Sequence, residues 1–422
     1  MRLLKFLLVF LVTAILVVGS IFWINRDTFM TVFQNRSAIL EGSEWVEKTY
    51  SLGGLIEFMA EQPQHSALIS LPVSIESEGQ RPENFQDDTV EHAIRYRSDL
   101  MHPAGTLTNL MLLITYAEMI TSGSLDPKNP VDTEKIADFY IPGLDRRHER
   151  TFRRWKNDRE SPLSVEELVH YLAHRNDPAV ADYLFFFLGA DEVTERASQL
   201  GDGCMEPPVP QFGLRMHALQ HSRSETLSNR LAKLARQDRT EFLNEAAATG
   251  RAQWEQPRTI PEIRISAFQD QRALHGLYPR VRPDRFADLL ASIWQGTLIN
   301  EETSRVLRDL LQQSPDDRLM QPHISWYASQ FDERMGFLGG WSAAGKKSGH
   351  FRVQIMLVVD IPAGLWFHMN SNFMIQDYHN RMLYDRDIQN RTYEMLMHQG
   401  SQTFRITQGK PGFIFRISEG KN

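Results

Sequence analysis

The sequence predicts an α/β (α+β) fold in which one antiparallel sheet is assembled from both ends of the chain and is covered by a helical lobe. Strand-like segments occur within residues 65–100 and again within 351–373, and amphipathic helical patterns fill most of the chain between them. Strands at both ends with helices between them indicate one sheet in one layered domain. The 422 residues, of which 42% are apolar, suffice for one large domain with insertions.

The N-terminal segment predicts a membrane anchor over residues 1–25. Arg2 and Lys5 precede residues 6–24, which carry no charge. At about 1.5 Å per residue, this apolar run comes close to the ~30 Å core of a bilayer. Basic residues before the run favour export of the remainder of the chain, so we expect a single-pass protein of a bacterial inner membrane with its main domain in the periplasm. Small residues at 18–20 leave open a cleaved signal peptide and secretion.

The part of the chain after the anchor alternates helical and strand patterns. A β-rich segment and a second segment in which apolar and polar residues alternate predict a pair of strands, and the polar segment with Gly and Pro between them predicts a loop. A nearly continuous apolar run then predicts a buried helix. In chain order we expect a partly helical stalk at 26–50, a helix at 51–62, a strand at 65–75, a loop at 76–88, a strand at 92–100 and a buried helix at 107–121.

The middle of the chain is predicted to be helical, and the C-terminal part to return to strands. Ser164 followed by Glu167 is a capping box, which marks a helix start. Residues 286–311 hold two amphipathic helices, and a terminal hairpin is expected from strands at 351–359 and 365–373. The main domain then covers residues 51–422, with insertions at about 76–88, 127–160 and 205–265.

Charge and cysteine content argue against several classes of site. The formal net charge of −7 gives no reason to expect nucleic acid as a partner, and the basic residues at 146–156 are flanked by acidic ones, as on a solvated surface. Cys204 is the only cysteine, so neither an intramolecular disulfide nor a cysteine-type metal site is possible. His170 and His174 share a helix face but have no acidic third ligand at a recognisable spacing, so we expect no metal ion and no cofactor.

Three stretches, taken in order, carry a resemblance to a known family. They are "YRSDLMHPAGTLTNLMLL" from residue 96, "LSVEELVHYLAHRNDPAVADYLFFFLG" from residue 163 and "KKSG" from residue 346. Over about residues 51–375 the chain resembles the serine β-lactamase and DD-peptidase superfamily, and most of all its class A branch. The resemblance implies an antiparallel sheet with a helical lobe, in agreement with the fold predicted from the patterns.

The resemblance assigns roles in acyl transfer to the first two motifs. Thr106 falls on the nucleophilic serine, and Asn109 falls on the lysine base three positions later. Asn176 falls on the serine that passes a proton to the leaving group, and Asp177 follows it. Pro178 replaces the asparagine that holds the substrate amide.

The third motif keeps the family's residues. Lys347, Ser348 and Gly349 match the Lys-Thr/Ser-Gly triplet, which the resemblance implies binds the substrate carboxylate and contributes to the oxyanion site. A ligand that carries a carboxylate is therefore expected at this end of the cleft.

The other substitutions remove the groups that move protons. Thr106 keeps a hydroxyl but adds a β-methyl group that restricts χ1 and crowds the path of attack. Asn109 carries an amide, which cannot serve as a base, and Asn176 has no transferable hydroxyl proton. The sequence therefore indicates a hydrolase homologue whose catalytic motifs have degenerated.

Several of these residues also have structural interpretations. Thr106 is a favoured N-cap for the buried helix, and Asp177 before Pro178 is a common N-cap pairing. Glu206 lies in "CMEPPVPQ", which faintly resembles the loop that carries the family's deacylating glutamate, but it is equally a residue of a Pro-rich surface loop.

The sequence leaves three functions to compare. The favoured one is a degenerate homologue that binds a peptidoglycan fragment, a β-lactam-like ligand or a protein partner through Lys347 and Ser348. The second is an active β-lactamase-like acyl hydrolase with Thr106 as nucleophile and an unusual base. The third is an envelope scaffold whose cleft is closed by the insertions.

Overall fold

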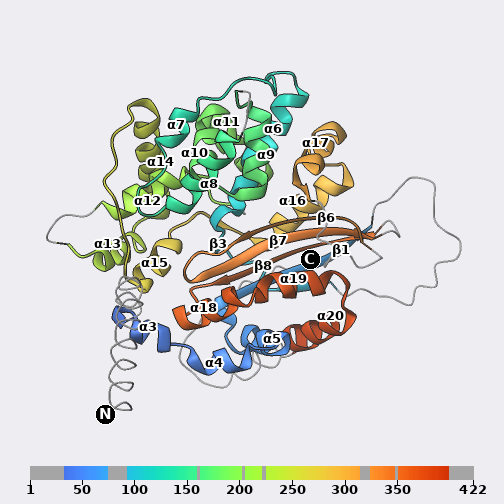
Figure 1. Cartoon of the computed structure of the whole chain (residues 1–422). Coiled ribbons are helices and arrows are strands. Elements are labelled where there is room, and N and C mark those ends of the chain that lie inside the picture. The colour runs from blue at the N-terminus through green and yellow to red at the C-terminus, as the bar shows by residue number, and fades with distance from the viewer. Residues whose placement is uncertain are drawn as a thin grey trace, which may run out of the picture.

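A six-stranded antiparallel sheet lies in the middle of the molecule (Figure 1). The computed structural model describes residues 33–74, 93–158, 162–201, 205–220, 225–313, 324–346 and 350–398. In sheet order the strands are β2 (Ile94–Tyr96), β1 (Ser66–Ser74), β8 (His350–Val359), β7 (Phe337–Lys346), β6 (Ile324–Asp332) and β5 (Gln312–Gln313). The sheet thus joins strands from the N-terminal and C-terminal parts of the chain, as predicted.

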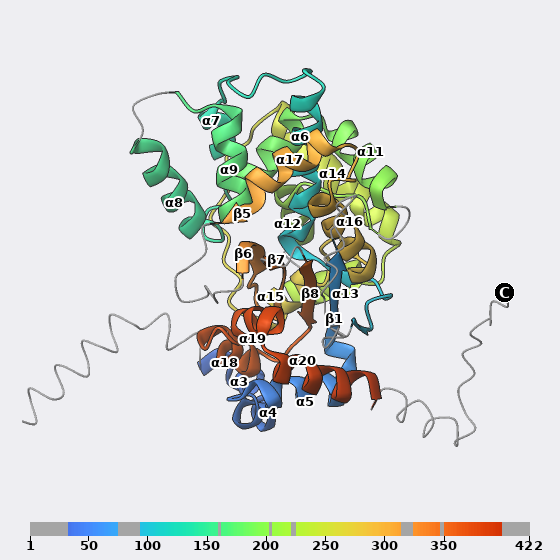
Figure 2. The same cartoon turned by 90° about the vertical axis from the view of Figure 1, so that its right-hand side faces the viewer.

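Apolar residues on both faces of the strands place the sheet between two cores. Alternate residues point to opposite faces of a strand. On β8, Val353 and Ile355 join the core beneath the helical lobe, whereas Met356 and Val358 join the core on the other face. Figure 2 shows the resulting three layers, with the sheet between two groups of helices.

The helices on one face come from both ends of the described chain. They are α3 (Arg36–Leu40), α4 (Ser43–Lys48), α5 (Leu52–Glu61), α18 (Ala363–Ser371), α19 (Met374–Tyr384) and α20 (Arg386–Tyr393). Trp45 of α4 is 7% exposed and packs edge-on against Phe58 of α5, with ring centroids 5.2 Å apart. Part of the segment expected to be a stalk therefore packs into the domain.

The helical lobe covers the other face of the sheet and holds residues 105–311. Its elements are η2 (Gly105–Asn109), α6 (Leu110–Thr121), α7 (Thr133–Ala137), α8 (Arg146–Asn157), α9 (Val165–Arg175), α10 (Pro178–Phe187), α11 (Ala190–Gly201), α12 (Gln211–Leu219), α13 (Leu227–Leu234), α14 (Arg239–Glu255), α15 (Phe268–His275), α16 (Pro283–Gln295) and α17 (Glu301–Leu311). The capping box of Ser164 and Glu167 begins α9, as predicted. A two-stranded sheet of β3 (His102–Pro103) and β4 (Arg280–Val281) lies at the base of the lobe.

The predicted hairpin of residues 351–359 and 365–373 is wrong in its second strand. Residues 363–371 form α18, and β8 instead pairs with β7 along its whole length. Leu365 and Met369 lie one helical turn apart, and both are buried in the core of this face. A short apolar run fits a strand or a buried helix equally well by periodicity, so the pattern alone could not decide.

The predicted membrane anchor at residues 6–24 lies outside the described residues. Among the residues that the structure describes, none of the helices has both the length and the apolar character needed to cross a bilayer. The expected loop at 76–88 and Cys204 also lie outside them.

Candidate ligand-binding cleft

Thr106 and Asn109 lie in the 3₁₀ turn η2, between β3 and α6. In a 3₁₀ helix the side chains at positions i and i+3 lie above one another, so both residues face the same side. They are buried, with exposed fractions of 2% for Thr106 and 4% for Asn109. Ala104, not Thr106, precedes the first residue of the turn. The interpretation of Thr106 as an N-cap is therefore wrong, because its hydroxyl caps neither η2 nor α6.

The backbone N–H of Thr106 donates a hydrogen bond to Asp332. Its nitrogen lies 2.8 Å from Asp332 Oδ2, at the end of β6. Gly105, with φ of 54°, makes this approach possible, because a Cβ at that position would lie 2.2 Å from the same oxygen. In acyl transfer, a backbone N–H beside the nucleophile stabilises a developing oxyanion. In this structure the N–H of Thr106 already donates to a side chain of the same protein, the carboxylate of Asp332.

Arg334 balances the charge of Asp332 and links it to the helical lobe. Its Nε donates to Asp332 Oδ1 at 3.2 Å, and its Nη2 donates to the side-chain oxygen of Gln211 at 2.7 Å. The guanidinium also lies over the ring of Tyr278, 4.4 Å from the centroid. Asp332 and Arg334 are therefore held by several contacts across the cleft.

Asn176 and Asp177 begin the connection from α9 to α10, on the lobe side of the cleft. Asn176 takes the left-handed conformation, with φ of 48°, and its Nδ2 makes a long contact of 3.5 Å to the carbonyl of Phe331. Asp177 caps α10 by accepting from the N–H groups of Ala179 and Val180, which confirms its interpretation as an N-cap. Burial raises the pKa of Asp177 to about 6, and its carboxylate is fully buried. Asp177 therefore serves the helix start and does not face a ligand.

Thr106 and Asn176 line a pocket of about 420 Å³, which we call the Thr106 pocket, whereas Asn109 and Asp177 are not part of its lining. The structure brings Thr106 and Asn176 together there with residues at the end of β6, as the order of the motifs implied. The lining residues are Thr106, Arg147, His148, Thr151, Tyr171, His174, Arg175, Asn176, Phe331, Asp332, Glu333 and Arg334. Burial lowers the pKa of His148 and of His174, so both imidazoles are neutral at pH 7.

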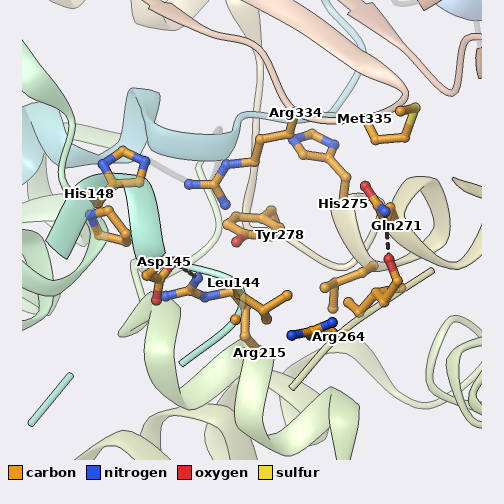
Figure 3. A pocket seen from close by; sticks show the side chains of 14 residues that line it. Leu144, Asp145, His148, Arg215, Arg264, Gln271, His275, Tyr278, Arg334 and Met335 are labelled. Atoms are coloured by element: carbon orange, nitrogen blue, oxygen red, sulfur yellow. Dashed lines mark hydrogen bonds and ion pairs between the residues drawn. The ribbon is translucent and has the colours of Figure 1, made fainter. Parts of the chain in front are cut away.

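A second pocket, of about 430 Å³, adjoins the first and shares His148 and Arg334 with it. We call it the Arg215 pocket (Figure 3). Its other lining residues come from the loop before α8, from the start of α10, from α12, from α15 and the segments on either side of it, and from the β6–β7 turn. They are Gly143, Leu144, Asp145, Pro178, Arg215, Arg264, Ile265, Gln271, Leu274, His275, Tyr278 and Met335. The cleft therefore has two compartments, one on each side of Arg334 and His148.

Lys347, Ser348 and Gly349 lie outside the described residues, but their neighbours are placed. Lys346 pairs with Ile324, the first residue of the nine-residue strand β6, whereas Thr106 contacts Asp332, its last residue. At ~3.3 Å per residue the two ends of β6 are roughly 26 Å apart, and consecutive Cα atoms are about 3.8 Å apart. Lys346, the last described residue before the triplet, therefore lies beside the end of β6 that is far from Asp332 and Thr106.

The residues at the cleft end of β6 were missed by the sequence analysis. Phe331, Asp332 and Glu333 stand there, and they contain no Lys-Thr/Ser-Gly triplet. The assignment of the triplet to Lys347, Ser348 and Gly349 stays a prediction, because these residues lie outside the described ranges. The available signal was the composition of "ISWYASQF", because Ile324, Trp326, Tyr327 and Phe331 are residues that strands favour.

Glu206 has a structural role. Arg239 binds both of its carboxylate oxygens, and the backbone N–H of Arg280 donates to Oε2 at 2.9 Å. The carboxylate thus fastens the Pro-rich loop to β4, and Glu206 lines neither pocket of the cleft. It is not placed to act as a base toward Thr106.

His170 and His174 lie on one face of α9, with ring centroids 6.5 Å apart. Within the described ranges, no three His, Cys, Asp or Glu side chains form a group that could hold a metal ion.

Comparison with known proteins places this arrangement in a family. Residues 83–342 match the model of the Beta-lactamase enzyme family. Three similar solved structures each share 12% sequence identity with this chain. A β-lactamase from Sphaerobacter thermophilus DSM 20745 has a TM-score of 0.46, with 83% of this chain and 98% of that chain covered, and the TLA-1 extended spectrum β-lactamase has a TM-score of 0.46, with 83% and 99% covered. PBP-A has a TM-score of 0.42, with 78% of this chain and 95% of that chain covered. A search of curated proteins finds no match. Because the family model spans more than half of the 422 residues, the chain belongs to the Beta-lactamase enzyme family.

Proposed function

We propose that this chain is a catalytically degenerate member of the family, which binds a carboxylate-bearing ligand of the peptidoglycan type without hydrolysing it. One observation carries the proposal. The N–H that would stabilise an oxyanion at Thr106 donates instead to the Asp332 carboxylate at 2.8 Å. A substrate carbonyl in that position would have to displace a negatively charged acceptor that Arg334 holds in place.

The surroundings of the Thr106 hydroxyl support the same conclusion. Its Oγ1 is buried and has no hydrogen-bond partner among the described residues. A general base must come within hydrogen-bond reach of the proton that it removes. The residue one turn further on is Asn109, whose amide cannot take that proton. An acyl hydrolase with Thr106 as nucleophile would lack both activation of the hydroxyl and a free oxyanion donor.

The charge of the cleft favours an anionic ligand. The Thr106 pocket is lined by three arginines, Arg147, Arg175 and Arg334, against two carboxylates, Asp332 and Glu333. The Arg215 pocket has three arginines and one carboxylate. Arginine is the side chain best suited to bind a carboxylate, through paired N–H donors. The two open pockets also argue against a scaffold with a closed cleft.

The N-terminal segment supports a place in the envelope. An anchor at residues 6–24 would hold the domain at the periplasmic face of the inner membrane, where peptidoglycan fragments occur. Fractionation of cells that express the full chain tests this part of the proposal, with recovery in the detergent-soluble membrane fraction expected. Recovery in the medium would favour signal cleavage.

The function is tested by two measurements on the same protein. The wild type is incubated with a fluorescent penicillin and separated by denaturing electrophoresis, and muropeptides with a free terminal carboxylate are titrated at equilibrium. We expect no covalent label and saturable binding, with binding retained in Thr106→Ala. A label on the wild type that disappears in Thr106→Ala would overturn the proposal in favour of an acyl hydrolase. Absence of both label and binding would overturn it in favour of a scaffold.

A further inference from the structure

We propose that the Arg215 pocket is the part of the cleft that takes the ligand's anionic group, with an attached aliphatic segment along its apolar wall. This inference rests on the proposed function, because it names the compartment and the ligand chemistry of the same cleft. The observation behind it is the side chain of Arg215, which lines the pocket although it is only 8% exposed.

Arg215 is incompletely paired. Its Nη1 donates to Asp145 Oδ1 at 2.6 Å and its Nε donates to the carbonyl of Gln211. Its Nη2 is buried and has no hydrogen-bond partner among the described residues. Interaction with Asp145 keeps the pKa of Arg215 raised despite its burial, so the guanidinium is charged. A buried cationic donor without an acceptor is costly, and a bound anion would remove that cost.

Asp145 contacts Arg215 through only one of its two carboxylate oxygens. Its Oδ1 accepts from Nη1 of Arg215, whereas its Oδ2 accepts the backbone N–H of Ile141 at 2.8 Å. The pair therefore meets through one oxygen and one nitrogen, rather than through the two parallel bonds that arginine and a carboxylate can form. Within the described residues, Nη2 of Arg215 therefore remains without an acceptor.

Arg334 supplies a second cationic donor to the same compartment. Its hydrogen bonds use Nε for Asp332 and Nη2 for Gln211, which leaves Nη1 without a partner among the described residues. Figure 3 shows the guanidinium groups of Arg334 and Arg215 beside Tyr278, with His148 on the same side of the pocket. His148 is neutral at pH 7 because burial lowers its pKa, so the two arginines provide the positive charge at this side.

An apolar wall of Leu144, Ile265, Leu274 and Met335 forms another part of the lining. Arg264, Gln271 and His275 also lie in this part of the pocket. Burial lowers the pKa of His275 to about 3, so this imidazole is neutral too. An uncharged aliphatic segment would therefore lie against this wall while its carboxylate meets the arginines. The matching chemical class is an N-acylated amino acid or short acyl peptide with a free carboxylate.

Equilibrium titration with hexanoyl-glycine, compared with hexanoyl-glycinamide, tests the inference. The two probes share the aliphatic chain and differ in the charge that Arg215 and Arg334 would bind. We expect saturable binding of the acid and at least tenfold weaker affinity for the amide. Hydrogen bonds to a charged group contribute enough binding free energy to change an affinity by about that factor. Equal affinities for acid and amide would overturn the proposal.

Two substitutions with opposite expected effects locate the anion. Asp145→Asn removes the competing carboxylate but keeps its shape, so binding of hexanoyl-glycine should become tighter. Arg215→Gln should weaken it about tenfold, and Arg305→Gln, an exposed arginine on α17, should leave it unchanged. If Arg215→Gln does not fold, the affinity of Asp145→Asn for hexanoyl-glycine is the test. Unchanged or weaker binding of hexanoyl-glycine by that variant would contradict the placement of the anion in the Arg215 pocket.

The outcome separates this inference from the proposed function. Covalent labelling by penicillin would overturn the degenerate-homologue proposal, whatever the effect of Asp145→Asn on hexanoyl-glycine. Saturable muropeptide binding that is insensitive to Asp145→Asn and Arg215→Gln would retain the proposed function and overturn the placement of the anion in the Arg215 pocket.

Discussion

The backbone N–H of Thr106 and the side chain of Asp332 form a 2.8 Å hydrogen bond across the cleft. The two residues are 226 positions apart in the sequence, and the contact joins the start of the helical lobe to the end of β6. Three features accompany this contact: the glycine at 105, the pairing of Asp332 with Arg334, and a Thr106 hydroxyl that is buried without a partner among the described residues. Each can be tested separately.

Gly105→Ala should destabilise the protein more than Gly123→Ala. Both glycines have positive φ, so each substitution carries backbone strain of about 1 kcal/mol. At Gly105 the new Cβ would also lie 2.2 Å from Asp332 Oδ2, whereas at Gly123 it would meet nothing within 4 Å. Urea unfolding of both variants measures the difference. Equal losses of stability would mean that Asp332 does not approach Gly105 as described.

Thr106→Val should be neutral or stabilising. Replacing an unpaired buried hydroxyl by a methyl group removes a desolvated polar atom without breaking a hydrogen bond. Thr115→Val is the matched control, because the hydroxyl of Thr115 is buried and donates to the carbonyl of Met111 at 2.8 Å. The control should lose about 1 kcal/mol of unfolding free energy. A comparable loss for Thr106→Val would show that its hydroxyl is engaged.

Asp182 should make the stability of the helical lobe depend on pH. It accepts the N–H groups of Gln211 and Phe212 at the start of α12, and burial raises its pKa from 3.8 to about 7. Between these values the folded protein binds a proton that the unfolded chain does not. The contribution of Asp182 is therefore complete below about pH 3.8 and is lost as the pH rises through 7, by about 1.4 kcal/mol per pH unit.

Comparison with Asp182→Asn isolates this contribution, because the other titrating groups are common to both proteins. The amide stays neutral, so the unfolding free energy of the variant should improve relative to the wild type as the pH rises from 4 to 7. Urea unfolding at several pH values measures the change. If the unfolding free energies of the two proteins differ by the same amount at every pH from 4 to 7, the raised pKa of Asp182 is contradicted.

The sequence predicts those parts of the fold that local patterns determine. A β-rich composition identified β1 as a strand, alternation identified β2, a capping box located the start of α9, and the motif order brought Thr106 and Asn176 into one cleft. The run at 365–373 was misassigned because its apolar residues suit either a strand or a buried helix. Only the packing of Leu365 and Met369 under the sheet decides between them.

The side chains that make the contacts in the cleft could not be predicted from the sequence. Asp332 and Arg334 matter because of contacts with Thr106, Gln211 and Tyr278, none of which is a neighbour in the chain. A motif search for a lysine triplet could not find them, since an aspartate stands at the end of β6. The unpaired donor of Arg215 likewise results from tertiary packing alone.

The central claim is that Thr106 does not act as an acylated nucleophile. The most direct measurement is the intact mass of the wild type after prolonged incubation with excess penicillin, with Thr106→Ala treated in parallel. We predict an unchanged mass for both proteins at every time. A mass increase equal to one penicillin on the wild type, absent from Thr106→Ala, would contradict the account.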